Sequence, residues 1–189
     1  MISIGFSTLL WGQVNNKNYE TVFNSVEKSD EESGFKYRAN FIFYHQDGDS
    51  LVLRGDVEVR RGSALLEAGE MVYYRTPNIL IARAGLDSSG EVGNLPVLKH
   101  RDEILMGNQI IFDMTNGSGK INDGKISKNK SYFTGDYVET QRASEFNVHN
   151  GTYTTCDLEK PHFDFYSPKI KVLVDDVAIA RPVYFRVAN

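Results

Sequence analysis

The chain has 189 residues, a formal net charge of −4 and 41% hydrophobic residues. This length is enough for one soluble domain with a sizeable core. No stretch gathers lysines and arginines, so the sequence argues against nucleic-acid binding, which needs a positive surface to neutralise phosphates.

The first 34 residues differ in composition from the rest. Residues 2–11 form an apolar run that is too short to span a bilayer, and polar residues follow it at once. We interpret residues 1–13 as the remnant of a secretory signal; the alternative is an ordinary buried strand. Residues 14–34 are rich in Asn, Ser, Glu and Asp, which predicts a solvated tail or linker. A short polar helix over residues 20–32 also fits them.

From residue 35 onward the sequence predicts strands. The segment 51–59 alternates, with Leu53 and Val57 on its apolar face and charged residues such as Glu58 on the other. Four dipeptides accept the positive φ angles of tight turns, and we expect hairpins there: Asp47-Gly48, Asn116-Gly117, Asp123-Gly124 and Asn150-Gly151. The prediction is an all-β domain over residues 35–189.

An eight-residue pattern recurs along this domain: apolar, any, small, any, any, apolar, any, apolar. Its copies are Leu66-Ala68-Met71-Tyr73, Leu105-Gly107-Ile110-Phe112 and Phe165-Ser167-Ile170-Val172, with a looser copy at Phe133-Gly135-Val138-Thr140. Side chains two residues apart share one face of a strand, so the step of three predicts an inserted residue, a β-bulge, at each small position. The repeat therefore predicts a stack of similarly bent strands.

Signals for catalysis or for a cofactor are missing from the sequence. The four histidines are scattered, and none has the spacing that places two imidazoles around one metal. The segment 116–120 superficially resembles a phosphate loop, but its glycine spacing is wrong and a hairpin turn explains it better. We therefore predict a protein that is not an enzyme and that holds no cofactor or metal.

The segments around Cys156 resemble the OstA/LptD family, which assembles lipopolysaccharide in the outer membrane. The resemblance is carried by residues 150–157, 161–163 and 165–170, and upstream by residues 53–59, 66–68, 73–74 and 133–136. It covers residues 51–189, and its upstream repeats are also similar to those of the soluble bridge protein LptA.

This resemblance implies a periplasmic β-jellyroll at the inner face of the outer membrane, an incompletely closed stack of V-shaped strands that shelters lipopolysaccharide acyl chains. It further implies an LptA-like bridge protein at the N-terminal edge, and an outer-membrane barrel with its lipoprotein partner beyond the C-terminus. Combined with the repeat, it predicts one shared lipid-binding interior, formed by Leu53, Val57, Leu66, Met71, Tyr73, Ile110, Phe112, Phe133, Val138, Phe165, Ile170 and Val172.

The family pattern departs from this chain in two respects. The family continues into a large membrane barrel, whereas this sequence stops at Asn189, so we interpret it as a fragment. The family also implies a disulfide between Cys156 and a barrel cysteine outside this chain; the alternative is that Cys156 is a small buried hydrophobic residue.

The direction of transport is a further expectation. Pro182 cannot donate a ladder hydrogen bond, and Val183, Phe185 and Val187 alternate after it, which predicts a strand that leaves the stack at the end handing lipid to the membrane. The segment 51–59 would then be the edge that meets the bridge protein.

Three alternatives stay open. The chain could be a soluble LptA-like bridge, or a carbohydrate-binding jelly roll or enzyme of the same architecture, and the apolar face could be a sealed core, which periodicity does not distinguish from a trough.

Overall fold

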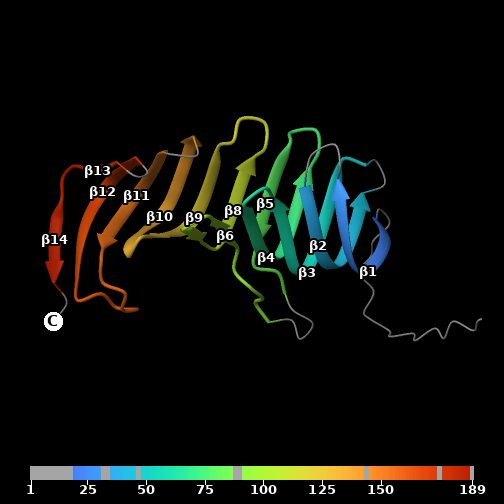
Figure 1. Ribbon diagram of the computed structural model, residues 1–189, viewed down its shortest axis with the longest axis horizontal. Helices are drawn as coiled ribbons and strands as arrows, with labels where there is room; N and C mark the ends of the chain where they lie inside the picture. The colour runs from blue at the N-terminus through green and yellow to red at the C-terminus, as the bar shows by residue number, and fades with distance from the viewer. Residues whose placement is uncertain are drawn as a thin grey trace, which may run out of the picture.

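The computed structural model describes residues 19–30, 35–45, 48–86, 91–142, 145–173 and 176–187, and within them every regular element is a strand. The strands lie side by side in one elongated, bent sheet (Figure 1). They are β1 (Tyr19–Asp30), β2 (Phe35–His45), β3 (Ser50–Arg61), β4 (Ala64–Tyr74), β5 (Ile79–Arg83), β6 (Val97–His100), β7 (Glu103–Met106), β8 (Gln109–Asp113), β9 (Gly119–Lys128), β10 (Ser131–Arg142), β11 (Glu145–Thr154), β12 (Phe163–Leu173), β13 (Val177–Ala180) and β14 (Tyr184–Val187). The prediction of an all-β fold is confirmed.

Most strands follow one another in chain order and pair antiparallel, from β1 to β13. Three long strands differ from this pattern, because along one edge each of them pairs with two short strands. One half of β4 pairs with β6 and the other half with β5; β9 divides in the same way between β7 and β8, and β12 between β14 and β13. Each of these strands therefore consists of two arms that meet at a bend, and the stacked bends give the sheet a V-shaped section.

The bends use residues that the sequence assigned to turns. Gly48 and Gly117 do lie in connections between strands, but Asp123 (φ 48°) lies inside β9 and Asn150 (φ 47°) inside β11. The hairpin prediction is therefore wrong at Asp123-Gly124 and Asn150-Gly151. Asn and Asp tolerate the left-handed backbone region, and here that property bends a strand instead of reversing the chain.

The inserted residue also lies elsewhere than predicted. Between the pairs Arg54–Glu70 and Val57–Ala68, β3 has two residues and β4 has one, so the bulge belongs to β3. In the copy on β10, the pairs Thr134–Thr152 and Tyr137–His149 enclose two residues on each strand, and no insertion is present. The prediction of a bulge in every copy is therefore wrong: most neighbouring strands bend together in register.

Side-chain hydrogen bonds join neighbouring strands along the bends. Three amide–carboxylate pairs lie there: Asn40–Asp56, Asn108–Asp123 and Asn150–Asp136. The donated N–H groups satisfy carboxylates next to backbone of unusual conformation, so the polar side of each bend is tied to the next strand.

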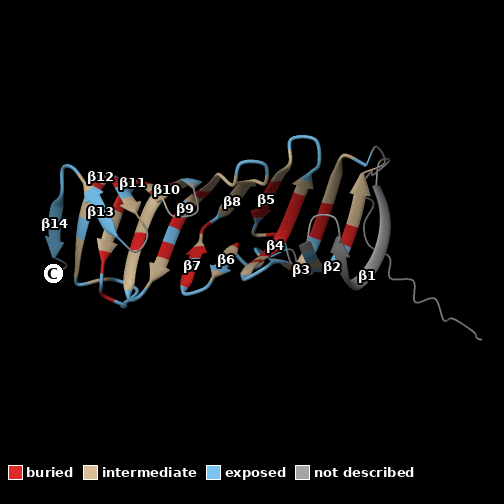
Figure 2. Cartoon of the chain, turned by 45° about the horizontal axis from the view of Figure 1, so that its top comes forward, coloured by how far each residue is buried: buried red, intermediate tan, exposed pale blue. Residues whose placement is uncertain are grey.

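The core lies between the two arms and runs along the stack, as the buried positions in the middle of successive strands show (Figure 2). Its most deeply buried large side chains include Ile42, Met71, Val57, Val138 and Val148. Because each strand contributes a few apolar residues to the same interior, the core is long and narrow, not globular.

The N-terminal edge differs from the expectation. Residues 19–30, predicted as part of a polar linker with a possible helical segment, form strand β1 and pair antiparallel with β2. The segment 51–59 lies in β3, two strands inside the edge, so its assignment as the edge is wrong. Residues 1–13, predicted as a signal remnant, lie outside the described residues.

The C-terminal end of the sheet consists of two short strands on the same neighbour. β13 and β14 both pair with β12, each with a different arm of it. A strand does follow Pro182, as predicted, but it stays in the stack over the described residues. The Arg186 guanidinium donates to Asp164 (Nε to Oδ1, 2.6 Å), and this carboxylate raises the pKa of Arg186 while tying β14 to β12.

Candidate binding trough

The structure gathers eleven of the twelve predicted interior residues into the core between the arms. Those buried are Leu53, Val57, Leu66, Met71, Ile110, Phe133, Val138 and Ile170; Tyr73, Phe112 and Val172 are half-buried and pack against them. The exception is Phe165, which is 37% exposed and lies against the ring of Phe185 on β14, with 5.1 Å between centroids. Phe165 thus belongs to the C-terminal end of the stack, because the short strand beside it does not cover it.

Sequence reasoning missed a whole copy of the repeat. Tyr37, Ala39, Ile42 and Tyr44 on β2 have the same spacing as the other copies; Ala39 and Ile42 are buried, and the two tyrosines pack on the core. The signal was present in the sequence, because the spacing of large and small residues that identifies the other copies, one of which also ends in tyrosine, occurs here too.

A hollow opens into this core near the C-terminal half, between the tips of the two arms. Its volume is about 300 Å³. Phe133 and Val172 contribute to its wall, and Lys128 and Glu103, whose Nζ and Oε1 atoms are 2.8 Å apart, lie at its polar margin. The core is thus not sealed at this point: apolar side chains that pack in the interior also line a space that a ligand could enter.

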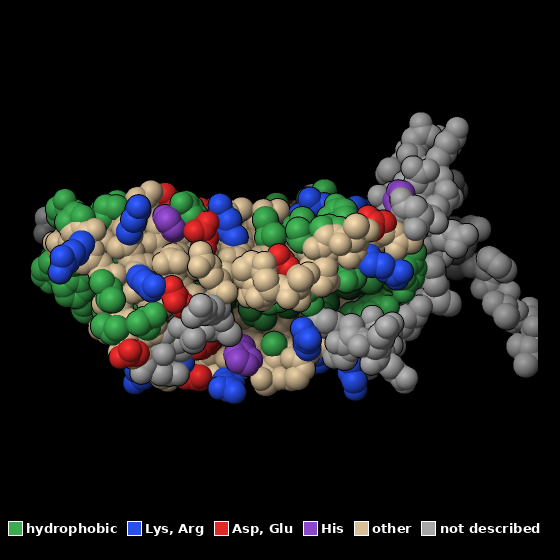
Figure 3. All heavy atoms as spheres, turned by 90° about the horizontal axis from the view of Figure 1, so that it is seen from above, with side chains coloured by type: hydrophobic (Ala, Val, Ile, Leu, Met, Phe, Trp, Pro, Cys, Tyr) green, Lys and Arg blue, Asp and Glu red, His purple; other side chains and the backbone are tan. Residues whose placement is uncertain are grey.

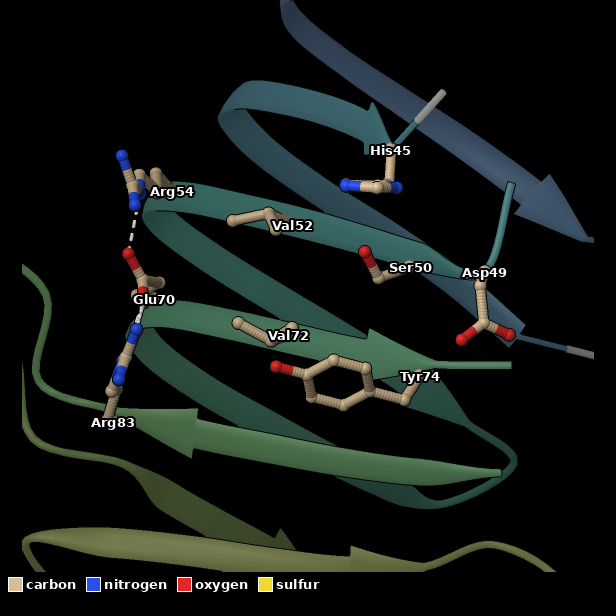
Figure 4. Close-up of a pocket in the computed structure, with 9 residues that line it drawn as sticks. All are labelled: His45, Asp49, Ser50, Val52, Arg54, Glu70, Val72, Tyr74 and Arg83. Carbon is tan, nitrogen blue, oxygen red and sulfur yellow. Dashed lines mark hydrogen bonds and ion pairs between the residues drawn. The ribbon is translucent and has the colours of Figure 1, made fainter. Parts of the chain in front are cut away.

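A second hollow, of about 350 Å³, lies on the outer face over β3 and β4 (Figure 4). Glu70 is buried at one end of it, between Arg54 (Nε to Oε2, 2.5 Å) and Arg83 (Nε to Oε1, 2.6 Å). The hydrogen bonds explain why a carboxylate is tolerated at this depth, since both of its oxygens are satisfied. Side chains alternate along β3 and β4, so this charged row faces away from the trough.

Glu58 also lies on the outer face. Its carboxylate accepts hydrogen bonds from Arg38 and from Arg60, whose Nη2 is 3.1 Å away. The Arg38 guanidinium lowers the pKa of Glu58, partial burial opposes this, and Arg60 adds to the lowering. Glu58 therefore stays ionised and outward, as the alternation of segment 51–59 predicts.

Cys156 lies in the connection between β11 and β12 and is buried. Its backbone N–H donates to Thr154 Oγ1 (3.0 Å), and Thr154 in turn donates to the carbonyl of Phe163 (2.8 Å). The Sγ atom lies 3.0 Å from Nδ1 of His162, which is on the surface. The thiol is therefore close to the C-terminal end of the stack but covered, and a disulfide with another domain would require this connection to move.

We expect Cys156 to react slowly with a thiol reagent such as DTNB in the folded chain and rapidly in urea, because burial blocks access to the thiolate. Replacing His162 with alanine should speed the reaction of the folded chain, since the imidazole covers the sulfur. Equal rates in buffer and in urea would contradict the burial and favour an accessible thiol.

Neither a metal centre nor a membrane helix is found in the part of the chain that the structure describes. No three His, Cys, Asp or Glu side chains there are placed to hold an ion together. Those residues also include no helix of the length and hydrophobicity needed to cross a bilayer.

Comparison with known proteins finds sequence similarity to one group of curated proteins. No family model matches the sequence. The chain is 25% identical over 129 residues to the LPS-assembly protein LptD of Pseudomonas entomophila, covering 67% of this chain, and 27% identical over 116 residues to LptD of Pseudomonas fluorescens, covering 60%. It spans only 13% and 11% of the length of these relatives.

A solved structure shares the fold. The chain superposes on LptH, the LptA-homologous periplasmic component of the lipopolysaccharide transport device of Pseudomonas aeruginosa, with a TM-score of 0.50 and 14% identity, covering 86% of this chain and all of LptH. This likeness confirms the predicted β-jellyroll. The chain is thus similar in sequence to part of LptD and in fold to the LptA-homologous LptH.

Proposed function

We propose that this domain is a non-enzymatic lipopolysaccharide transport module that shelters acyl chains in its apolar trough. The observation that supports this most is the continuous core between the arms, which opens at the hollow beside Phe133 and Val172. Keeping one acyl methylene out of water is worth about 0.8 kcal/mol, so a chain of about a dozen carbons needs about 10 kcal/mol of shelter. A long apolar trough provides such shelter at every point along a path.

The lipid-binding residues in this proposal are the predicted interior set. Phe165 acts later on the path than the others, because it lies at the exposed C-terminal end. There, hydrophobic side chains gather at the surface, at the left end of Figure 3. Phe185 and Val187 on β14 are 60% and 63% exposed, which is unusual for large apolar residues unless they contact a partner or a lipid.

The proposed partners follow from the two ends of the stack. Among the described strands, β1 is the outermost at the N-terminal end, and an LptA-like bridge protein could extend the sheet there by backbone pairing. At the other end, β13 and β14 would face an outer-membrane barrel and its lipoprotein partner. A disulfide from Cys156 to that barrel would require the connection between β11 and β12 to move. The proposed location is the periplasm, at the inner face of the outer membrane.

Site-specific photo-crosslinking tests the proposal. A photo-reactive amino acid at Tyr73 or Phe112 should capture lipopolysaccharide on irradiation, because both side chains are half-buried and pack on the core. The matched control is the same amino acid at Glu58, on the outer face of a strand that also contributes to the trough. Equal capture at all three positions, or capture at Glu58 alone, would contradict a lipid-binding interior.

The alternative, a soluble bridge of the LptA type, uses the same trough and is favoured by the likeness to LptH. The two assignments differ in one observable. A coding sequence that continues past codon 189 into alternating strands with aromatic girdles belongs to a barrel protein.

A further inference from the structure

One hydrogen bond spans the trough near its N-terminal end. The hydroxyl groups of Tyr37 and Tyr44 lie 3.1 Å apart, although both residues belong to β2 and are seven positions apart. In a straight strand, seven residues span about 23 Å. The bend of β2, which lies between them, folds the two arms toward each other so that the tyrosine tips meet.

The two tyrosines lie at the opposite ends of their copy of the repeat. Tyr37 is the first residue of its copy and Tyr44 the last, which are the positions nearest the tips of the two arms. Tyr37 pairs with Val59 on one arm of β3, and Tyr44 with Leu51 on the other arm. Both rings pack on the core and are partly exposed, so their hydroxyl groups meet where the interior approaches solvent.

Other strands present different side chains at these positions. Toward the C-terminal end, Phe133 holds the first position of the copy on β10, which corresponds to Tyr37. Val172 holds the last position of the copy on β12, which corresponds to Tyr44. Both side chains line the hollow of about 300 Å³. Phenylalanine and valine have no polar group with which to hold two arms together. The trough is therefore held shut by a polar contact at β2 and is hollow between the arms from β9 to β13.

We propose that Tyr37 and Tyr44 form a latch that closes the trough at its second strand and that must open each time a lipid passes. This inference rests on the proposed function and adds a regulated step to it. A lipid whose acyl chains lie between the arms keeps its sugar head group in water, so the gap between the arm tips must be open along its whole path. A contact that bridges the arms blocks the head group at that strand. Parting the two hydroxyl groups leaves each of them able to bond water, so the latch can open without stranding a polar group.

The test compares lipid capture at the latch with capture at the distant hollow. A photo-reactive amino acid is placed at Leu51, beside the latch, or at Phe133, in the hollow, and the full chain is mixed with lipopolysaccharide. The first variant combines Y37F with Y44F, which removes the hydrogen bond between the two hydroxyl groups and keeps both aromatic rings. Capture at Leu51 should rise about fivefold, the effect of one neutral hydrogen bond, while capture at Phe133 stays the same.

A second variant locks the latch. Tyr37→Cys and Tyr44→Cys are combined with Cys156→Ser, so that a short bifunctional maleimide can bridge only the two new thiols. Bridging should reduce capture at Leu51 to background and leave capture at Phe133 intact, whereas a monofunctional maleimide of similar bulk on the same variant should not. Circular dichroism and urea midpoints of each variant establish that the sheet is retained.

The outcomes separate the latch from the proposed function. Unchanged capture at Leu51 after bridging, or capture at Phe133 without any capture at Leu51 in the unbridged forms, overturns the latch and leaves the trough. Absence of capture at both positions in every form overturns the lipid-binding trough itself, and the latch with it.

Discussion

Replacing Leu53 with proline should lower the free energy of unfolding by about 5 kcal/mol, enough to unfold a domain of ordinary stability. Leu53 is 3% exposed and lies within β3, where it pairs with Ile42 on β2 and with Met71 on β4. Proline removes a strand N–H and cannot take part in the ladder at a central position. The loss of a buried leucine side chain adds about 2 to 5 kcal/mol to this cost. Urea denaturation followed by circular dichroism measures the effect.

The matched control is Val177→Pro, at the first residue of β13. Val177 is 43% exposed, and its short strand pairs only with β12 within the described residues. Proline is tolerated at the start of an edge strand, so this variant should stay within about 1 kcal/mol of the parent. If Leu53→Pro instead left the urea midpoint unchanged, β3 would have to be an edge strand, as the sequence alone suggested for segment 51–59.

Much of the fold could be predicted from the repeat in the sequence. The spacing at Leu66 to Tyr73 and at Leu105 to Phe112 predicts which side chains share one interior, because two-residue alternation is imposed by strand geometry whatever the neighbours are. In the structure, these side chains lie in the same core. The resemblance to the OstA/LptD family added what periodicity does not contain, namely the jellyroll fold and the proposal that its interior shelters lipid.

The order of the strands at the edges of the sheet could not be predicted from the sequence and is known only from the structure. Burial of Leu53 and Val57 fixes the face of β3 but not the number of strands beyond it. Residues 19–30 are polar enough to read as a linker, yet they form β1, because backbone pairing with β2 needs no apolar pattern. For the same reason, local sequence does not reveal which end of the sheet a strand occupies.

The roles of the turn residues were also set by their surroundings. A dipeptide such as Asp123-Gly124 indicates that the backbone can adopt positive φ angles there, but it does not determine whether the chain reverses direction. At Asn116-Gly117 the flanking strands β8 and β9 pair with each other and a hairpin results. At Asp123 the residues on both sides continue in one strand between neighbours that bend at the same level, and the left-handed residue becomes part of the bend.

Gly69→Ala should lower the free energy of unfolding by about 3 kcal/mol, at the upper end of the usual cost of overpacking. Gly69 lies at the bend of β4, between the half that pairs with β6 and the half that pairs with β5. A Cβ atom there would lie 2.4 Å from the backbone nitrogen of Gly85 and 3.0 Å from its Cα. Both are backbone atoms, so the clash cannot be relieved by turning a side chain, and the bend of β4 must move away from the Gly85 segment.

The control for this substitution is Gly117→Asn in the turn between β8 and β9. Its φ is +74°, where asparagine is tolerated, and nothing lies within 4 Å of the position that a Cβ would take. We expect a change of no more than about 1 kcal/mol there. The same strand carries Met71 and Tyr73, which face the trough. A shift of its bend should therefore alter lipopolysaccharide capture at Tyr73 in the Gly69→Ala chain that remains folded. Equal urea midpoints for the two variants would mean that β4 and the Gly85 segment do not approach this closely, and that the bend is shaped by some other contact.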